Sequence, residues 1–182
     1  EIDFGWKISK NLQYEFFTSI GDWRWNSGDT VNFYLNQELV DQDYFDAKGV
    51  PVGDSPQTQI GSSISYDFKL NKSNTGYITL KGVYFDRFFS DFNPATLNDE
   101  KEVWQIPSYN LFSLHIGNTI YFENSSLELK LNVLNLFNTI YLSDAENNSQ
   151  YVEDTPENSD AASASAFFGL GRKIMGGIQY KF

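Results

Sequence analysis

The chain has no cysteine, a single histidine and no long apolar run. Its 182 residues therefore offer neither a disulfide framework nor a thiolate metal site. Mean hydropathy is -0.41, and no apolar stretch approaches the roughly 18 residues that a membrane-spanning helix requires. Strands that carry apolar residues only at alternate positions are not excluded, because averaging along the chain hides that alternation.

Basic residues are also scarce. Thirteen Lys and Arg against 24 Asp and Glu give a net charge of -11, which argues against binding to nucleic acid through phosphates. The stretch from Asp144 to Asp160 holds six acidic residues and no basic one, so we expect a solvated loop. Calcium binding there is an alternative, but the stretch lacks the ordered spacing of an EF-hand. We predict no metal and no cofactor.

What the sequence does contain is alternation. Hydrophobic residues make up 41% of the chain and aromatic residues 17%. From Leu127 to Val133 every second residue is apolar, with Glu128, Lys130 and Asn132 between them, and this period of two is typical of a β-strand. The same pattern predicts seven strands: 2–8, 12–25, 59–68, 77–89, 108–122, 127–134 and 168–182.

The connections between these segments alternate in length. Short turns are predicted at 9–11, 69–76 and 123–125, and long polar loops at 26–55, 90–107 and 143–167. Barrels of the bacterial outer membrane have short periplasmic turns and longer extracellular loops. The sequence therefore predicts an all-β fold, an antiparallel transmembrane β-barrel, whose last strand ends in the periplasm at Phe182.

The charged residues decide which face of each strand meets lipid. A lysine in hydrocarbon costs about 2 to 4 kcal/mol near the bilayer midplane. We therefore expect the charged set to face the barrel lumen and the Ile, Leu, Phe and Tyr set to face lipid. The residues predicted to face the lumen include Lys81, His115, Glu128, Lys130 and Asn132.

Several segments resemble one protein family. The ending Phe168–Phe182, with Ile178, Tyr180 and a final Phe182, resembles the last strand of TonB-dependent receptors, and Leu131–Asn138 (LNVLNLFN) resembles their penultimate strand. Further resemblances, some of them typical of Bacteroidetes receptors, lie in segments 21–25, 49–57, 84–92 and 106–112.

The resemblance implies more than these residues show. Such receptors have about 22 strands around a plug, and they import scarce large nutrients such as siderophores, cobalamin, glycans or peptides. Residues 1–182 would then be the C-terminal part of one barrel domain, with the plug and the other strands outside this chain. The implied partners are lipid and lipopolysaccharide, TonB-ExbB-ExbD through the N-terminal part, and the barrel-assembly machinery, which binds Ile178, Tyr180 and Phe182. SusC-like members also have a surface lipoprotein lid.

Two other folds remain open. Val31–Val40 is an eighth candidate strand, and eight strands suffice for a small closed barrel with a passive or structural role. A soluble antiparallel sandwich would bury the same apolar faces between two sheets. The family resemblance argues against the small barrel, and the terminal Phe182 and the alternation of loop lengths argue against the sandwich.

Few residues in the sequence are candidates for catalysis or ligand binding. His115 has no second histidine or cysteine with which to share a metal, so we expect a polar lining residue and no enzyme. Trp23, Arg24, Trp25 and Trp104 fall near the predicted extracellular strand ends. The tryptophans are candidates for stacking on a sugar or aromatic ligand and Arg24 for binding an anion, but membrane-boundary anchoring is the favoured role of such tryptophans.

Overall fold

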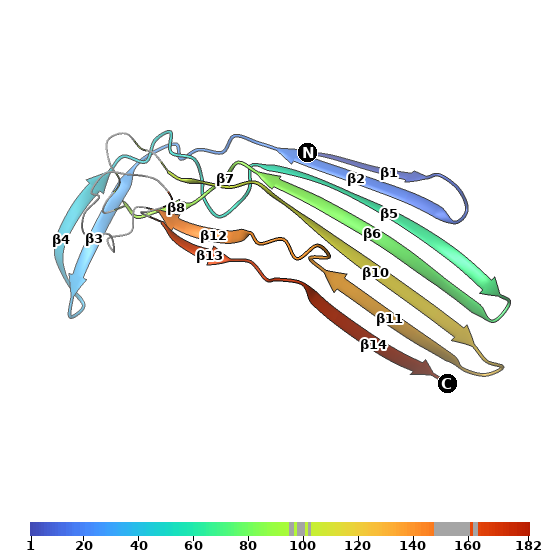
Figure 1. Cartoon of the computed structure of the whole chain (residues 1–182). Helices are drawn as coiled ribbons and strands as arrows, with labels where there is room; N and C mark the ends of the chain where they lie inside the picture. Colours follow the sequence, from blue (N-terminus) through green and yellow to red (C-terminus); the bar gives the residue numbers. More distant parts are fainter. Residues whose placement is uncertain (95–96, 98–100, 102, 148–160, 162–163) are drawn as a thin grey trace.

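A long antiparallel sheet dominates the structure. The computed structural model describes residues 1–94, 97, 101, 103–147, 161 and 164–182. Its largest sheet has seven strands in the order β1-β2-β5-β6-β10-β11-β14 (Figure 1). Their bounds are β1 (Ile2–Lys7), β2 (Leu12–Ile20), β5 (Thr58–Asn71), β6 (Asn74–Asp86), β10 (Tyr109–Tyr121), β11 (Ser126–Leu134) and β14 (Lys173–Lys181). The prediction of an all-β fold with seven such strands is confirmed.

Each strand of this sheet pairs with the strand that precedes it in the sheet order and runs antiparallel to it. Short turns join β1 to β2, β5 to β6 and β10 to β11 at one end of the sheet. The long connections and the smaller sheets gather at the other end, and the C-terminus lies at the end with the short turns (Figure 1). The predicted alternation of short and long connections is therefore present.

The strand register gives the sheet two chemically distinct faces. Residues paired across an antiparallel sheet point to the same side. One such row across all seven strands is apolar: Trp6, Tyr14, Ile64, Leu80, Leu114, Val133 and Ile174. The next row points to the other side and is mostly polar: Lys7, Gln13, Ser65, Thr79, His115, Asn132 and Met175. We call these two sides the apolar face and the polar face.

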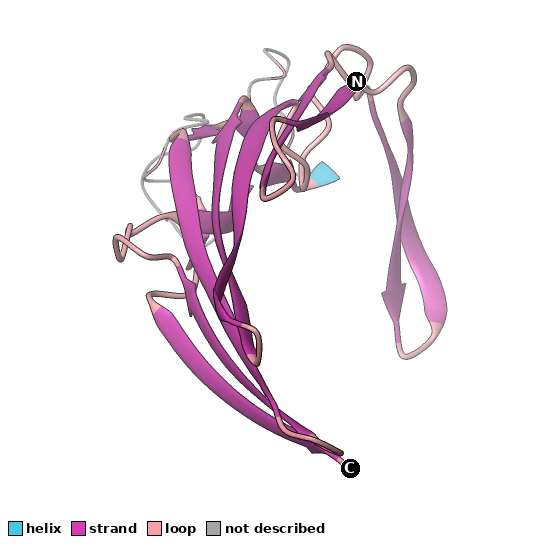
Figure 2. Cartoon of the chain, turned by 90° about the vertical axis from the view of Figure 1, so that its right-hand side faces the viewer, coloured by secondary structure: helices cyan, strands magenta, loops and turns pink. Residues whose placement is uncertain are grey.

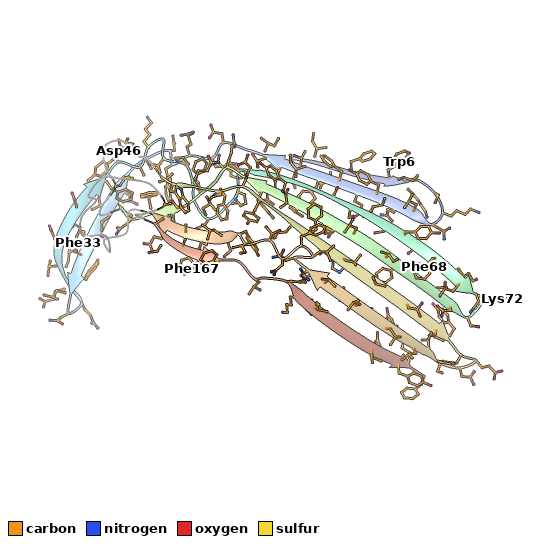
Figure 3. All side chains as sticks on the ribbon, in the orientation of Figure 1. Trp6, Phe33, Asp46, Phe68, Lys72 and Phe167 are labelled. Carbon is orange, nitrogen blue, oxygen red and sulfur yellow. The ribbon has the colours of Figure 1, made fainter. Side chains whose placement is uncertain are left out.

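The apolar face is open. Trp6 is 56% exposed, Ile64 43% and Ile178 78%. Val133 of the same face is buried at 9%, and on the polar face Ser63 is 6% exposed whereas the Lys130 side chain is 43% exposed. Figure 2 shows the strands bending together into an arc, and Figure 3 places Trp6 at the outer margin of the sheet. In the described part of the chain, the buried hydrophobic clusters do not lie on the apolar face of this sheet.

The buried core lies in the long connections instead. One cluster contains Ala47, Val50 and Phe92, and a second contains Phe88, Ile106 and Ala145. Short strands organise these connections: β7 (Phe88–Phe89) pairs with β9 (Gln105–Ile106), and β12 (Leu142–Asn147) lies between β13 (Ser165–Phe168) and β8 (Asp91–Phe92). We call this assembly at the end of the sheet the loop cap.

Residues 31–40 are not an eighth strand of the large sheet. They span β3 (Asp29–Leu35), a turn and the start of β4 (Glu38–Phe45), which pair only with each other among the described strands. The turn residues Asn36 and Gln37 have φ of 51° and 71°, as a two-residue hairpin of this twist requires. Phe33 lies on this hairpin, which stands apart from the arc of the sheet (Figures 2 and 3).

Three predicted strands are too long. The segment predicted at 12–25 leaves the sheet after Ile20, because Trp23 and Trp25 form backbone hydrogen bonds with Val52 and Val50. The segment at 77–89 breaks at Arg87, whose φ is 49°. The segment at 168–182 divides into the end of β13 and β14. The predicted turn at 69–76 is too long, since only Lys72 and Ser73 separate β5 from β6.

Candidate functional site

The polar face brings together the residues predicted to line an interior. His115 lies in the middle of β10, opposite Thr79 of β6 and Asn132 of β11. Its Nδ1 is 2.7 Å from Asn132 Oδ1, and its Nε2 is 3.2 Å from Ser113 Oγ. Since Asn132 Oδ1 can only accept, Nδ1 carries the proton and Nε2 accepts from the Ser113 hydroxyl.

This serine, histidine and asparagine chain has the connectivity of a nucleophile and its base. Acyl transfer also needs N–H groups aimed at the developing oxyanion. Ser113 lies inside β10, an interior strand of the sheet, where backbone N–H groups are used in pairing with β6 and β11. The arrangement therefore satisfies the hydrogen bonding of His115 and orders the polar face.

Three charged residues on this face, Glu15, Glu128 and Lys130, have polar partners along or across strands. Lys130 Nζ lies 3.0 Å from Glu128 Oε1, and Ser63 Oγ donates to Glu15 Oε2 at 3.1 Å. Glu15, Ser63 and Lys81 line a cavity of about 340 Å³, together with Asp3 of β1. The ammonium of Lys81 is not within ion-pair distance of any carboxylate that the structure describes.

The tryptophans and Arg24 occupy two different parts of the loop cap. Trp25 packs edge to face on Phe92 of the first cluster, with ring centroids 6.0 Å apart, whereas Trp104 packs on the second cluster. Arg24 donates to Asp22 Oδ1 at 3.0 Å and to the carbonyl oxygen of Gly49 at 2.8 Å. Its guanidinium thus already has an acidic partner, although Trp23 and Trp25 remain 42% and 44% exposed.

A buried polar junction at the exit of β6 was not predicted. Gln57 is 1% exposed and donates through Nε2 to the carbonyl oxygen of Trp23 at 2.8 Å. The Arg87 guanidinium donates to the carbonyl oxygen of Gly21 and to Gln57 Oε1. This junction ties the ends of β2, β5 and β6 together. Nothing in the alternation of these strands distinguishes Arg87 from a solvated arginine.

The segment LNVLNLFN, noted for its family resemblance, forms a second junction. Asn135 is 7% exposed with φ 47°, and its Nδ2 donates to the carbonyl oxygens of Thr139 (2.9 Å) and Leu170 (3.1 Å). Asn138, with φ 55°, accepts from the Arg172 N–H at 2.9 Å. We call these contacts the asparagine junction. It fixes the end of β11 against the start of β14.

The last strand is open along one edge. β14 pairs with β11 and with no other described strand. Ile178, Tyr180 and Phe182 are 78%, 50% and 101% exposed, and the rings of the last two meet at a centroid distance of 5.0 Å. These three side chains therefore form an accessible apolar end of the strand.

Three acidic residues, Asp54, Asp91 and Asp144, interact electrostatically in the loop cap. Burial, together with the charges of Asp91 and Asp144, raises the pKa of Asp54 above its ordinary value of 3.8. Among the described residues, no group of three or more His, Cys, Asp or Glu is arranged to hold a metal ion. Most of the acidic stretch predicted as a solvated loop, from residue 148 to 160, lies outside the described residues.

Comparison of the chain with protein-family models, curated proteins and solved structures finds no match. A search of the described residues for a helix long and apolar enough to span a membrane also finds none. The structure shows the fold class: an all-β protein with a large antiparallel sheet that has one apolar and one polar face.

Proposed function

We propose that this chain is the C-terminal part of a transmembrane β-barrel of the Gram-negative outer membrane, and that the barrel is a TonB-dependent nutrient importer. The observation that carries the proposal is the exposed apolar face of the seven-stranded sheet. Soluble monomers rarely leave contiguous apolar patches larger than a few hundred Å² in water. Lipid tails are the environment that such a face fits.

Strand length supports the same proposal. Six of the seven strands have 9 to 14 residues, and a tilted strand needs about 9 to 11 to cross a bilayer. At about 3.3 Å per residue, β5 alone extends roughly 46 Å, more than the apolar band of about 25 Å. The excess would carry β5 beyond the band.

The two sheet edges also support barrel closure. In the described structure β1 pairs only with β2, and β14 only with β11, so each presents unpaired backbone groups. Long open edges promote aggregation in soluble proteins, and closure removes them. We infer that further strands of the same protein complete the ring, with the polar face turned toward its interior.

The importer function rests on the family resemblance of LNVLNLFN and the terminal strand. In this proposal TonB-ExbB-ExbD acts through a plug outside this chain, and the loop cap faces the cell exterior, where lipopolysaccharide and a surface lipoprotein lid are its neighbours. The barrel-assembly machinery would bind Ile178, Tyr180 and Phe182. No catalysis and no cofactor are part of the proposal.

Two experiments test the two parts of the proposed function, membrane location and transport, separately. First, Leu131→Lys places a charge on the apolar face, and Asn132→Lys, its matched control, places the same charge on the polar face. Outer-membrane fractions of cells should contain far less of the Leu131 variant than of the control. Equal amounts of both variants would contradict the membrane assignment.

Second, a strain lacking the gene should lose uptake of one of four labelled nutrients: an iron siderophore, cobalamin, an oligosaccharide or a peptide. A proton uncoupler should abolish the same uptake in the parent strain. Uptake that depends on the gene but persists with the uncoupler would indicate a passive barrel instead.

A further inference from the structure

An apolar cavity lies on the polar face, close to the asparagine junction. Its volume is about 270 Å³. Its apolar walls come from four strands and from the segments that join β11 to β14. The residues that line it are Lys81, Val83, Phe85, Leu111, Phe112, Ser113, Leu134, Asn135, Tyr141, Leu170, Gly171 and Lys173.

Aromatic rings form one wall of this cavity. Phe85 and Tyr141 both line it, and Tyr109 lies between them, with ring centroids 5.0 Å from Phe85 and 4.6 Å from Tyr141. The ring of Tyr141 is held over Gly169, where an added Cβ would meet ring carbons at 2.0 to 2.6 Å. The three rings are tilted by 36° and 31° from one to the next, and this aromatic wall suits an aromatic ligand.

Two lysines stand at opposite sides of the cavity. Lys81 is paired with Ser113, and Leu134 is paired with Lys173. Extending the β10–β11 register by one residue places Ser113 beside Leu134. The two lysine Cα atoms are therefore separated by three strand spacings, about 14 Å. Neither ammonium lies within 4.0 Å of a carboxylate that the structure describes.

These observations define the ligand by its chemistry. An unpaired cation beside apolar walls attracts an anion that has an apolar body. We infer that this cavity binds a planar apolar dicarboxylate, with one carboxylate on Lys81 and the other on Lys173. A volume near 270 Å³ is small among ligand pockets and admits about two fused rings.

This inference goes beyond the proposed function and rests on it, since the cavity lies on what would be the interior wall of the barrel. The test uses the full-length protein in nonionic detergent and three probes with one ring system: 2,6-naphthalenedicarboxylate, 2-naphthoate and 2-naphthamide. Isothermal titration calorimetry should rank them in that order. Each carboxylate should contribute about a ten-fold increase in affinity.

Substitutions test whether Lys81 and Lys173 each bind one carboxylate of the ligand. Lys81→Gln and Lys173→Gln should each weaken dicarboxylate binding about ten-fold, to the level of 2-naphthoate, and leave 2-naphthamide unchanged. Lys181→Gln, which changes a lysine on the same strand as Lys173 but outside the cavity, should have no effect. Tyr141→Leu should weaken binding of all three probes, since it removes part of the aromatic wall.

Equal binding of the dicarboxylate and the amide would overturn the inference, and so would an equal effect of Lys181→Gln. Faster migration of the unheated protein in SDS gels reports barrel assembly independently of ligand. An assembled protein without probe binding therefore refutes this inference alone. A protein absent from the outer membrane refutes the proposed function instead.

Discussion

Removing the Asn135 side chain should destabilise the fold more than any other polar truncation near β14. The amide of Asn135 makes three hydrogen bonds, two donated by Nδ2 and one accepted by Oδ1 from the Thr139 N–H at 2.8 Å. At about 1 kcal/mol each, their loss amounts to about 3 kcal/mol. Alanine at φ 47° adds about 1 kcal/mol of backbone strain.

We therefore expect Asn135→Ala to lower the free energy of unfolding by about 4 kcal/mol. Asn135→Gly should lower it by about 3 kcal/mol, because glycine accepts the positive φ and loses only the hydrogen bonds. Asn138→Gly, the matched control, loses a single side-chain hydrogen bond to Arg172 and should cost about 1 kcal/mol.

The measurement is urea unfolding of the full-length protein in lipid vesicles, followed by its mobility in unheated SDS gels. A midpoint for Asn135→Ala that equals the parent value would refute the reasoning. So would a larger loss for Asn138→Gly than for Asn135→Gly, because the hydrogen bonds would then not set the order.

Two further predictions concern other parts of the chain. Gly82→Ala should lower the free energy of unfolding by about 1 to 3 kcal/mol, because an added Cβ would lie 2.7 Å from the ring of Phe112. In the control Gly177→Ala the added Cβ has its nearest neighbour at 3.8 Å, so the free energy of unfolding should change by under about 0.5 kcal/mol. Equal effects of the two substitutions in urea unfolding would contradict the close packing at Gly82. Because the pKa of Asp54 is raised in the folded state, its stabilising contribution is present below the ordinary pKa of 3.8 and is lost as the pH rises through the raised value. The loop cap should therefore resist limited proteolysis better at about pH 4 than at about pH 7, and Asp54→Asn should reduce that difference; an unchanged difference in the variant would exclude Asp54 as its source.

Alternation predicted the large sheet well, for a physical reason. A strand with one polar and one apolar face has a period of two whatever its surroundings, so segments such as 127–134 are visible in the sequence alone. The same pattern placed His115, Lys130 and Asn132 on one face, and the structure has them there.

The ends of the strands were harder to predict, because they depend on contacts between distant residues. Trp23 and Trp25 continue the aromatic character of β2, yet their backbones pair with residues 50–52 of the loop cap. Val31–Val40 alternates as a strand would, but Asn36 and Gln37 turn the chain back on itself. Local pattern does not reveal such a choice of partner.

The two polar junctions and the apolar cavity could not be derived from alternation either. Asn135 and Asn138 were noted as part of a motif, but their hydrogen bonds to Leu170 and Arg172 join segments about 35 residues apart. Lys81 and Lys173 face one cavity only because β6, β10, β11 and β14 are adjacent. The separation of Lys81 and Lys173 along the sequence does not predict that these strands are neighbours.

The central claim is that neighbouring residues of one strand meet lipid and a polar interior in turn. Because this chain has no native cysteine, a cysteine introduced at Ser63, Ile64, Ser65 or Tyr66 of β5 carries the only nitroxide spin label within these 182 residues when the full-length protein is labelled in bilayers. The labels at 64 and 66 should collide readily with oxygen dissolved in lipid, and those at 63 and 65 should not. Equal oxygen accessibility at all four positions, or the opposite alternation, would contradict the account.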